Sequence, residues 1–326
     1  PEISVAMATF QGREFLQEQF ESLLKQTRQP DEVIIYDDAS SDDTVSLLKA
    51  FRCRAPFRVE IIEGTENAGV NHAFGTALAA CRGTYIFFCD QDDLWESEKI
   101  GRFMAAFQSN RNIGLVFCDA SQIDAEGLAL PESLWQQIKF NKQRRRRFRR
   151  DPLGELLRGA NFVYGMAAAF RAESIQPFCR INADPGGMTH DTWFALHVVA
   201  IGWQAVALEE KLVRYRRHGR QATKKESLSK SEGVRVCPAA RRRQLLALIE
   251  GLQRVGINIS AAPSLGAQPY KDKVVRQISS KVSHLLLRER LRDSRNPFLG
   301  CYAFVSAGYW KYARGPLSVF RDLFGL

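Results

Sequence analysis

Three carboxylates within four positions are the feature of this sequence that most directly suggests chemistry. Asp90, Asp92 and Asp93 follow at once on residues 85–89, an apolar run with the composition of a buried strand. Such a cluster repels itself, so water, a basic side chain or a cation has to balance it. Asp90 and Asp92 point the same way if the chain stays extended, whereas Asp93 points elsewhere. One use for such a pair is to bind Mg²⁺ or Mn²⁺, with a diphosphate and water completing the coordination.

A polar turn is the alternative interpretation of the same carboxylates. Residues 92–100 read DDLWESEKI, and an Asp at the start of such a segment is a common helix cap. The spacing alone does not separate a helix cap from a metal site, so the surrounding elements have to be considered.

The sequence around the carboxylates predicts a parallel sheet that would bring them to one edge. Residues 3–10 and 31–38 are apolar on both faces, as expected of buried parallel strands, and residues 59–64 form a third short strand. Apolar residues recur at helical spacing in residues 14–27 and 70–83. Strands that alternate with helices indicate a doubly wound α/β sheet with right-handed crossovers, which binds ligands beyond the carboxyl ends of its strands. The acidic residues at those ends are Asp37, Asp38, Asp90 and Asp92.

The rest of the chain continues the alternation of strands and helices. Ser40 and Asp43 are spaced as a capping box for the helix after the second strand. The basic run around Arg144 to Arg150 has the pattern of a surface loop or of the flank of a helix. The remaining predicted elements are strands at 113–120 and 161–170, a Gly-Pro turn at 184–188, and helices at 190–202, 241–255 and 281–293.

Length and composition fit a folded protein of one large or two ordinary domains. The chain has 326 residues, of which 45% are hydrophobic, enough to bury a substantial core. No apolar run approaches the roughly 20 residues that cross a bilayer, and the first residues have the pattern of a strand rather than of a signal peptide. We therefore expect a cytoplasmic protein. The seven cysteines are odd in number and never spaced C-x-x-C, which argues against a disulfide framework or a zinc finger.

The formal net charge of +10 conceals two parts of opposite sign. Residues 1–138 carry 11 Lys and Arg against 22 Asp and Glu, whereas residues 139–326 carry 35 against 14. The densest segment is KFNKQRRRRFRR at residues 139–150, with eight cations in twelve positions and no acid. The acidic part should repel a nucleic-acid backbone unless a metal intervenes, whereas the basic part could meet an anionic surface or ligand.

Four segments occur in an order that resembles the N-terminal half of family 2 glycosyltransferases with the GT-A fold. They are VAMATFQGREFLQEQFESLLKQT, IIYDDASSDDT, ENAGVNHAF and GTYIFFCDQDDLWESEKI. The likeness is strongest to bacterial rhamnosyltransferase-like members, and it continues through NFVYGMAAAFR, THDTWFALHVVAIG and VRYRRHGRQAT. The resemblance implies an α/β fold of GT-A type. This is a doubly wound, mostly parallel sheet with helices on both faces, here with a C-terminal helical extension.

The resemblance also implies a nucleotide-sugar site at the strand ends. Thr9 and Phe10 close the first strand, where the nucleotide pocket of the family begins. Asp38 stands where a carboxylate accepts from the N3–H of uracil or thymine, and the alternative is that it caps the following turn. Asn67 and Gly69 would line the nucleotide, or they form an ordinary Asn/Gly turn.

Metal ligands and a catalytic base follow from the same resemblance. Asp90 would contact the ribose or the metal, and Asp92 would bind the Mg²⁺ or Mn²⁺ that holds the diphosphate. His218 matches a late His that reaches the metal or the diphosphate in some relatives, although it could equally lie on a solvated face. The base in similar enzymes is an acid at the start of a helix in the acceptor half, and Asp191 supplies it here. An Asp is also common at this place for the helix dipole alone.

Several neighbouring side chains have open roles. His190 could orient an acceptor or cap its helix, and Arg216 or Arg217 could pair with phosphate oxygens. Trp95 and Trp193 are expected to pack in the core rather than to serve as platforms for a sugar.

The leading interpretation is an inverting, metal-dependent glycosyltransferase. It would move rhamnose or another deoxyhexose from a dTDP- or UDP-sugar to a cell-surface polysaccharide or a lipid-linked saccharide precursor. One alternative is a nucleic-acid-binding protein built on residues 139–150, but only Phe140 and Phe148 interleave with the cations, so we expect no nucleic-acid partner. The other is a non-catalytic relative that only binds a sugar nucleotide.

The expected organisation is a glycosyltransferase domain at residues 1–220 and a basic, mainly helical region at residues 221–326. Within the domain, residues 1–120 would bind the nucleotide sugar and residues 121–220 the acceptor. Residues 139–150 would hold the enzyme on the anionic inner face of the plasma membrane, where a lipid-linked acceptor lies. The alternative for this run is a solvated, partly disordered loop.

Overall fold

The structure is a computed structural model that describes residues 1–159, 161–179, 187–221, 238–261 and 268–294, together with residues 303, 311, 312 and 318. Most of the Gly-Pro turn expected at residues 184–188 lies outside the described residues, as does much of the expected C-terminal region.

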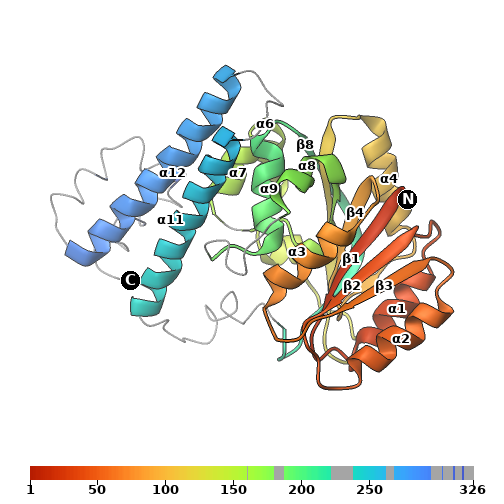
Figure 1. Cartoon of the computed structure of the whole chain (residues 1–326). Coiled ribbons are helices and arrows are strands. Elements are labelled where there is room, and N and C mark those ends of the chain that lie inside the picture. Colours follow the sequence, from red (N-terminus) through yellow and green to blue (C-terminus); the bar gives the residue numbers. More distant parts are fainter. Residues whose placement is uncertain are drawn as a thin grey trace.

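Four parallel strands form the N-terminal half of an eight-stranded sheet. In chain order they are β1 (Ile3–Thr9), β2 (Glu32–Asp37), β3 (Arg58–Glu63) and β4 (Tyr85–Cys89), and they lie in the order β3-β2-β1-β4. β2 and β4 are buried along their whole length, which explains why β4 is continuously apolar and why β2 is so between Glu32 and Asp37. Because the four strands run in one direction, their carboxyl ends reach the same edge of the sheet (Figure 1).

The other four strands extend the sheet beyond β4, and they do not all run in the same direction. β7 (Ala168–Arg171) is antiparallel to β4 and to β6 (Ile113–Ile123), while β6 is parallel to β8 (Gln204–Arg216). The two-residue strand β5 (Leu94–Trp95) closes the edge antiparallel to β8, giving the order β3-β2-β1-β4-β7-β6-β8-β5. Since β5 comes directly after the three carboxylates, its pairing brings the end of β8 to them.

Helices cover both faces of the sheet (Figure 1). α1 (Leu16–Leu24), α2 (Thr44–Arg54) and α4 (Lys99–Ser109) pack on one face, and α3 (Val70–Ala80) and α9 (His190–Ala200) on the other. Alternate residues of β1 enter the two cores: Val5 and Met7 join the first and Ala6 the second. The remaining short helices are α5 (Leu134–Gln137), α6 (Lys142–Arg150), α7 (Pro152–Leu157), η1 (Gly165–Ala167), α8 (Ala172–Ile175) and η2 (Gln176–Phe178).

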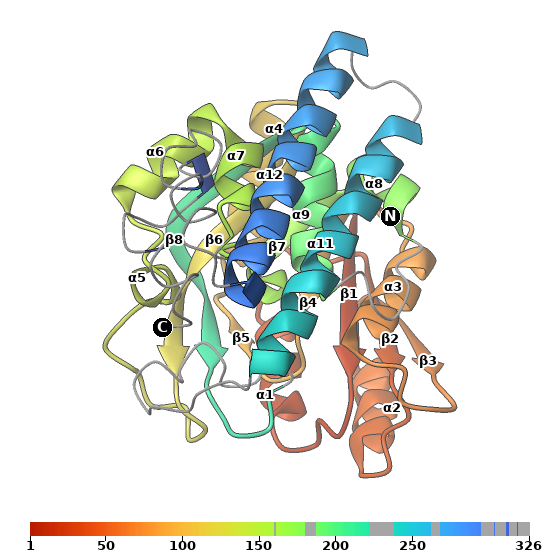
Figure 2. The same ribbon diagram turned by 90° about the vertical axis from the view of Figure 1, so that its left-hand side faces the viewer.

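Two long C-terminal helices pack on the α9 side of the molecule. α11 (Pro238–Ala261) and α12 (Gln268–Ser294) lie against each other, and Figure 2 views them in front of the sheet. Leu252 and Val255 of α11 belong to the same buried cluster as Phe194 of α9. The expected mostly parallel α/β sheet with helices on both faces and a C-terminal helical extension is confirmed. Among the helices described, none is both long enough and apolar enough to cross a bilayer.

Three local predictions differ from the structure. The predicted capping box does not form. The N-cap residue of α2 is Asp43, whose side chain makes no capping hydrogen bond, and the Ser40 hydroxyl donates to Asp37 Oδ1 at 2.7 Å. Only the end of the strand expected at 161–170 is extended, since residues 165–167 form the single turn η1. The basic run is neither a loop nor a flank, because most of it forms helix α6.

Candidate functional site

The ends of β1 and β2 hold the first group of candidate residues. Thr9 is buried and its hydroxyl donates to Asp37 Oδ1 at 2.8 Å. The Asp38 carboxylate accepts from the backbone N–H groups of Ala68 and Gly69, at 2.9 and 2.8 Å. Gly69 has a φ of +89°, a conformation that favours glycine. Asp38 therefore shapes the turn before α3, and because each carboxylate oxygen has two lone pairs it can still accept from a base.

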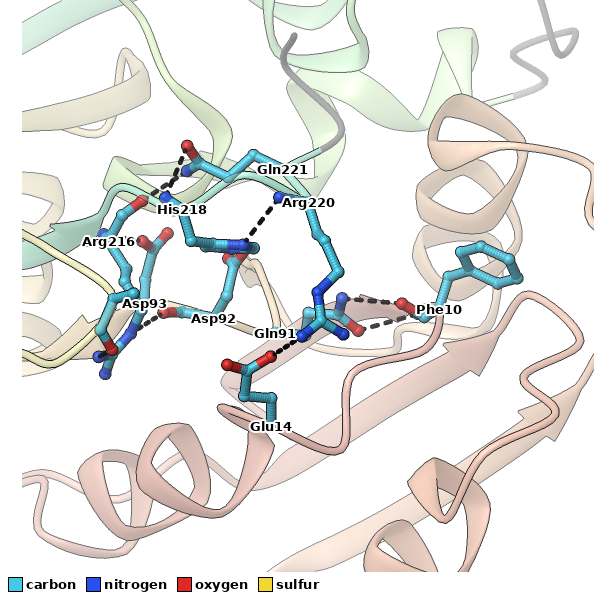
Figure 3. Close-up of polar contacts among 10 residues, drawn as sticks. Phe10, Glu14, Gln91, Asp92, Asp93, Arg216, His218, Arg220 and Gln221 are labelled. Carbon is cyan, nitrogen blue, oxygen red and sulfur yellow. Dashed lines mark hydrogen bonds and ion pairs between the residues drawn. The ribbon is translucent and has the colours of Figure 1, made fainter. Parts of the chain in front are cut away.

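Phe10 and Asn67 border this region from outside. The Phe10 side chain is 42% exposed, and Asn67 is exposed as well. The backbone of Phe10 is held by Gln91, whose side-chain amide accepts from the Phe10 N–H and donates to the Phe10 carbonyl, both at 2.9 Å (Figure 3). Gln91 thus ties the loop after β1 to the acidic segment after β4.

The carboxylates after β4 lie in different surroundings. Burial first, and then the carboxylates of Asp92 and Asp191, raise the pKa of the half-buried Asp90 to about 8. Asp93 is fully buried; its Oδ1 accepts from the Arg216 N–H at 2.9 Å, and its Oδ2 has no hydrogen-bond partner among the described residues. Burial and the charges of Asp92 and Asp90 raise the pKa of Asp93 as well. Both shifts favour the protonated carboxyl, because the described surroundings stabilise a negative charge poorly at these two positions.

His218 lies directly against Asp92. Its Nε2 is 2.7 Å from Asp92 Oδ2, and the Arg220 N–H donates to its Nδ1 at 3.3 Å (Figure 3). Because Nδ1 accepts, Nε2 carries the proton that faces Asp92. The Gln221 side chain donates to the Arg216 carbonyl at 2.5 Å, and Arg220 pairs with Glu14.

Arg216 is a structural residue rather than a phosphate ligand. It is 1% exposed, and its guanidinium donates to the Asp92 carbonyl at 2.9 Å, to the Ala125 carbonyl at 2.9 Å and to Glu18 at 2.7 Å. The proposal that Arg216 pairs with phosphate is therefore wrong. Arg217 is half-buried and contacts Gln137 at 3.3 Å.

Asp191 is buried in the first turn of α9, where several donors fix its carboxylate. The N–H of Gly165 donates to Oδ2 at 3.0 Å and the N–H of Thr192 to Oδ1 at 2.6 Å. The Asn161 amide lies 3.5 Å from both oxygens, and Thr189 donates its hydroxyl to Oδ1. Asp191 also raises the pKa of Asp90, and the ring of the neighbouring His190 lies 5.4 Å from that of Phe88 in β4, so the start of α9 adjoins the end of β4.

His190 has neither of the roles considered for it. Its ring is buried, stacks on Phe74 with centroids 3.9 Å apart, and tilts against Phe88 at 5.4 Å. Neither ring nitrogen has a hydrogen-bond partner in the part of the chain that the structure describes, and burial lowers the pKa of His190. The ring is a packing element that keeps the start of α9 close to α3. Trp95 and Trp193 are likewise buried, as expected.

The donor atoms present fit a divalent metal of the Mg²⁺ or Mn²⁺ type, although they do not form a preformed cage. Within the described part of the chain, no group of three or more His, Cys, Asp or Glu side chains is placed to hold a metal ion. Carboxylates are nevertheless the ligands these metals prefer, and such metals commonly take only one or two protein ligands beside substrate phosphates and water. The raised pKa of Asp90 and the unpaired oxygen of Asp93 mark a place where a cation would be stabilised.

Four supporting residues were missed in the sequence. Gln91 and Asn161 contact the candidate residues from loops, Gly165 contacts them from η1, and Asn71 reaches them from α3. Gln91 lies between Asp90 and Asp92, and this position is a signal in the sequence that could have identified it as a supporting residue. The others are ordinary loop or helix residues whose partners are distant in sequence, and no local pattern distinguishes them.

Comparison with known proteins gives a consistent picture. Residues 4–176, more than half of the chain, match the family model described as "Glycosyl transferase family 2". An uncharacterized glycosyltransferase, alr2836, of Nostoc sp. is 25% identical over 220 residues, 67% of this chain and 65% of that protein. The putative teichuronic acid biosynthesis glycosyltransferase TuaG of Bacillus subtilis is 29% identical over 140 residues, 41% of this chain and 55% of that protein. The chain thus spans less than two thirds of the length of these relatives.

Solved structures show the likeness in fold. TarS of S. aureus, residues 1–349 in complex with UDP-GlcNAc, has a TM-score of 0.61 at 13% identity, covering 99% of this chain and 89% of that chain. The mannosyltransferase PcManGT of Pyrobaculum calidifontis, in complex with GDP-Man and Mn²⁺, has a TM-score of 0.50 at 17% identity, covering 100% and 88%. The likeness to TarS confirms the expected fold type.

Proposed function

Because the chain belongs to glycosyl transferase family 2, we propose that it is an inverting, metal-dependent hexosyltransferase. It moves a sugar, such as rhamnose or another deoxyhexose, from a dTDP- or UDP-sugar to a cell-surface polysaccharide or a lipid-linked precursor. One observation carries the proposal most directly. The ring of His190, the neighbour of Asp191 at the start of α9, lies 5.4 Å from that of Phe88, two residues before Asp90, so a candidate base adjoins the candidate donor site.

The donor nucleotide would lie across the carboxyl ends of β1, β2 and β4. Thr9, Phe10, Asp38, Asn67, Gly69 and Asp90 would line it. Support comes from the buried Thr9 and Asp38 and from the glycine at the start of α3, which leaves open space beside the chain. TarS has been solved with UDP-GlcNAc and PcManGT with GDP-Man, so similar folds bind different nucleotides. The dTDP or UDP specificity proposed for this chain therefore comes from its sequence.

Asp90, Asp92 and His218 would hold the metal. When bound, Mg²⁺ or Mn²⁺ supplies positive charge that stabilises the leaving nucleoside diphosphate. His218 has to give up the Nε2 proton that faces Asp92 before it can be a ligand. Asp92 needs no such change, and it is the central ligand of the proposal.

Asp191 would act as the general base. It takes the proton of an acceptor hydroxyl while the hydroxyl oxygen bonds to the anomeric carbon and the bond from that carbon to the diphosphate oxygen breaks. A single displacement of this kind inverts the anomeric centre. The donors from Gly165, Thr192 and Asn161 fix the carboxylate, so that little reorganisation is needed during the reaction.

The acceptor half is proposed to be residues 121–220, beside a nucleotide-sugar half at residues 1–120. The basic region at residues 221–326 is proposed as an extension rather than as an independent domain, because α11 shares a buried cluster with α9. A cytoplasmic enzyme at the inner face of the plasma membrane would meet a lipid-linked acceptor there. TuaG is named for teichuronic acid biosynthesis, which supports the acceptor class proposed here.

The test is to measure turnover of a panel of dTDP-, UDP- and GDP-sugars, with Mn²⁺ present or chelated. We expect turnover of a deoxyhexose nucleotide that stops on chelation and returns when Mn²⁺ is added back. Nucleotide binding without turnover of any donor would favour the non-catalytic alternative. Turnover that persists with chelator would exclude the metal from the proposal.

A further inference from the structure

The cations of the basic run fall into two groups. Arg144 and Arg147 pair with the buried carboxylate of Glu155, at 2.7 and 2.9 Å. Arg145 and Arg149 pair with Glu209 of β8, at 3.1 and 3.3 Å. The other four cations make no ion pair with any residue described in the structure, and all four are exposed: Lys139, Lys142, Arg146 and Arg150.

Three of the unpaired cations lie on one stripe of α6. Lys142, Arg146 and Arg150 are four residues apart, a spacing that brings side chains onto the same face of a helix. Phe148 is fully buried, with its ring 5.3 Å from that of Phe162, so the stripe faces away from the core. We call Lys142, Arg146 and Arg150 the α6 stripe.

The aromatic residues near the α6 stripe indicate which class of partner it binds. Single-stranded nucleic acid is bound by cations together with exposed aromatic rings on which bases stack. Phe140 and Phe148, the two aromatic residues of the run, are both fully buried. A straight row of cations without stacking surfaces suits a plane of lipid phosphates better.

We propose that the α6 stripe, with Lys139 beside it, docks on an anionic lipid bilayer. The docked surface belongs to the proposed acceptor half, because Phe148 packs on Phe162, the neighbour of Asn161, which contacts Asp191. The biological purpose of this docking rests on the function proposed above. The docking itself does not, since it is measured without any sugar donor.

The experiment compares two triple variants of the full chain by sedimentation with vesicles. Lys142→Gln, Arg146→Gln and Arg150→Gln remove the stripe. Lys25→Gln, Arg52→Gln and Arg111→Gln remove the same charge from exposed cations on residues 1–138 that form no ion pair within the described part of the chain. The probes are phosphatidylcholine vesicles with and without phosphatidylglycerol, at low and high salt. We expect the stripe variant to bind anionic vesicles about a hundredfold more weakly, roughly fivefold per cation, and the control to bind nearly as the parent.

Equal binding by the two variants would overturn the proposal, as would binding that ignores anionic lipid or salt. Adding duplex DNA and single-stranded RNA to the same assay covers the competing partner. If nucleic acid displaces the vesicles at matched phosphate, in a way that depends on the stripe, the partner is nucleic acid and the lipid assignment is wrong. Both outcomes are independent of whether the enzyme transfers sugar.

A separate observation concerns Asn71 in the first turn of α3. Its side-chain oxygen accepts from the N–H of His190 at 2.8 Å, and its amide donates to the Met188 carbonyl at 3.2 Å. Thr189, the N-cap residue of α9, makes no capping hydrogen bond with its own side chain. Asn71 therefore satisfies an N–H at the start of α9 from another helix, 119 positions away in sequence.

The same helix is anchored at the proposed nucleotide site. Asp38 accepts from the N–H of Gly69, the N-cap residue of α3, and Asn71 follows two residues later. One turn further, Phe74 stacks on the ring of His190. The start of α3 thus contacts Asp38 at the proposed nucleotide site, and the first two turns of α3 contact α9, the helix that carries Asp191.

We infer that Asn71 is a positioning residue that places Asp191, and this rests on the proposed function of Asp191 as base. If the base is displaced, kcat falls, whereas the affinity for the donor nucleotide does not change. Asn71→Ala should therefore lower kcat by roughly ten- to a hundredfold while nucleotide affinity stays unchanged. Asn112→Ala, the same change at an exposed asparagine, is the control and should leave both values as in the parent.

A double-mutant cycle with Asp191→Asn separates positioning from general loss of structure. If Asn71 acts through Asp191, adding Asn71→Ala to Asp191→Asn lowers the residual rate no further. An additive effect, or full activity of Asn71→Ala, would overturn the inference. Full activity of Asp191→Asn alone would instead overturn the proposed base. Asn71→Asp, which keeps the volume and the acceptor for the His190 N–H, replaces Asn71→Ala in the cycle if that variant does not fold.

Discussion

Asp191 is held by donors that no local sequence pattern reveals. The sequence placed an acid at the start of a helix, and the structure shows the N–H of Gly165 and the amide of Asn161 converging on it. Both donors come from the segment before β7, about 30 residues upstream, for which the sequence indicated only a strand. A residue type can be read from a motif, whereas its orientation depends on contacts that form only in the folded chain.

Asp191→Asn should separate chemistry from donor binding. The amide cannot take a proton from the acceptor hydroxyl, so we expect kcat to fall by about 10²–10⁴-fold. Donor binding should remain near normal, because the proposed nucleotide contacts lie at Asp38 and Asp90. Calorimetric titration with the nucleotide, beside initial rates, makes the comparison. Undiminished turnover would remove Asp191 from the mechanism, and lost nucleotide binding would make it a structural residue.

Asp92→Asn should act on the metal instead. The change removes one charge and almost no volume, so the fold should persist while transfer falls by two or more orders of magnitude at low Mn²⁺. Part of the loss should return as Mn²⁺ is raised. Glu126→Gln, which removes a charge from an exposed loop, is the matched control. Near-normal transfer at low Mn²⁺ would show that Asp92 does not bind the metal.

Arg216 and His190 show where reasoning about single residues failed. Both are polar types beside a proposed site, and both are buried: Arg216 in contacts with Asp92, Asp93 and Glu18, and His190 between two phenylalanines. The sequence contains the residue type and its neighbours along the chain. It does not contain the direction of the side chain, which decides between a ligand and a packing element.

At the scale of elements, helix α6 differs most from the prediction, which was a loop or the flank of a helix. Eight cations in twelve positions argue for a solvated segment, because like charges in successive helical turns repel each other. The structure offsets that repulsion with two carboxylates from outside the run, Glu155 and Glu209. Phe140 and Phe148 then anchor the helix in the core. Longer elements with clear periodicity, such as α3, α9 and α11, were predicted correctly because their patterns are local.

Glu155→Gln should loosen α6 and α7 in a pH-dependent way. Burial alone would raise the pKa of Glu155, but hydrogen bonds from Arg147 and Arg144 outweigh it, and the pKa is lowered from its ordinary 4.5. A lowered pKa stabilises the fold above about pH 4.5, and this contribution is lost as the pH falls through the folded value. At neutral pH we expect a loss of about 1.5–3 kcal/mol in the free energy of unfolding.

Denaturant unfolding of the parent and the variant at several pH values measures this loss. The gap between them should close as the pH falls from 4.5 through the lowered pKa of Glu155 in the folded protein. Glu209→Gln is the control, because Glu209 is 57% exposed and its pairs should contribute at most about 1 kcal/mol. A gap for Glu155→Gln that stays constant with pH would contradict the ionic explanation.

At the scale of the whole molecule, the parallel half of the sheet was predictable and the other half was not. β1 to β4 alternate with helices, and right-handed crossovers then leave few arrangements. β7 is antiparallel to both of its neighbours, and β5 has only two residues, too few for any periodic signal. Their places depend on pairing with residues far along the chain, so the side of the site built by β8 remained hidden.

The contacts between β8 and the acidic segment also determine when the site can exist during synthesis. Three hydrogen bonds join Asp92 and Asp93 to Arg216 and His218, across 123, 124 and 126 positions. A nascent chain that has released only β1 to β4 can form its parallel strands, but its carboxylates still lack these partners. Closing such long loops costs chain entropy, which slows the step. The proposed donor site therefore matures later than the parallel strands, because a growing polypeptide cannot reach its finished geometry until residue 218 has left the ribosome.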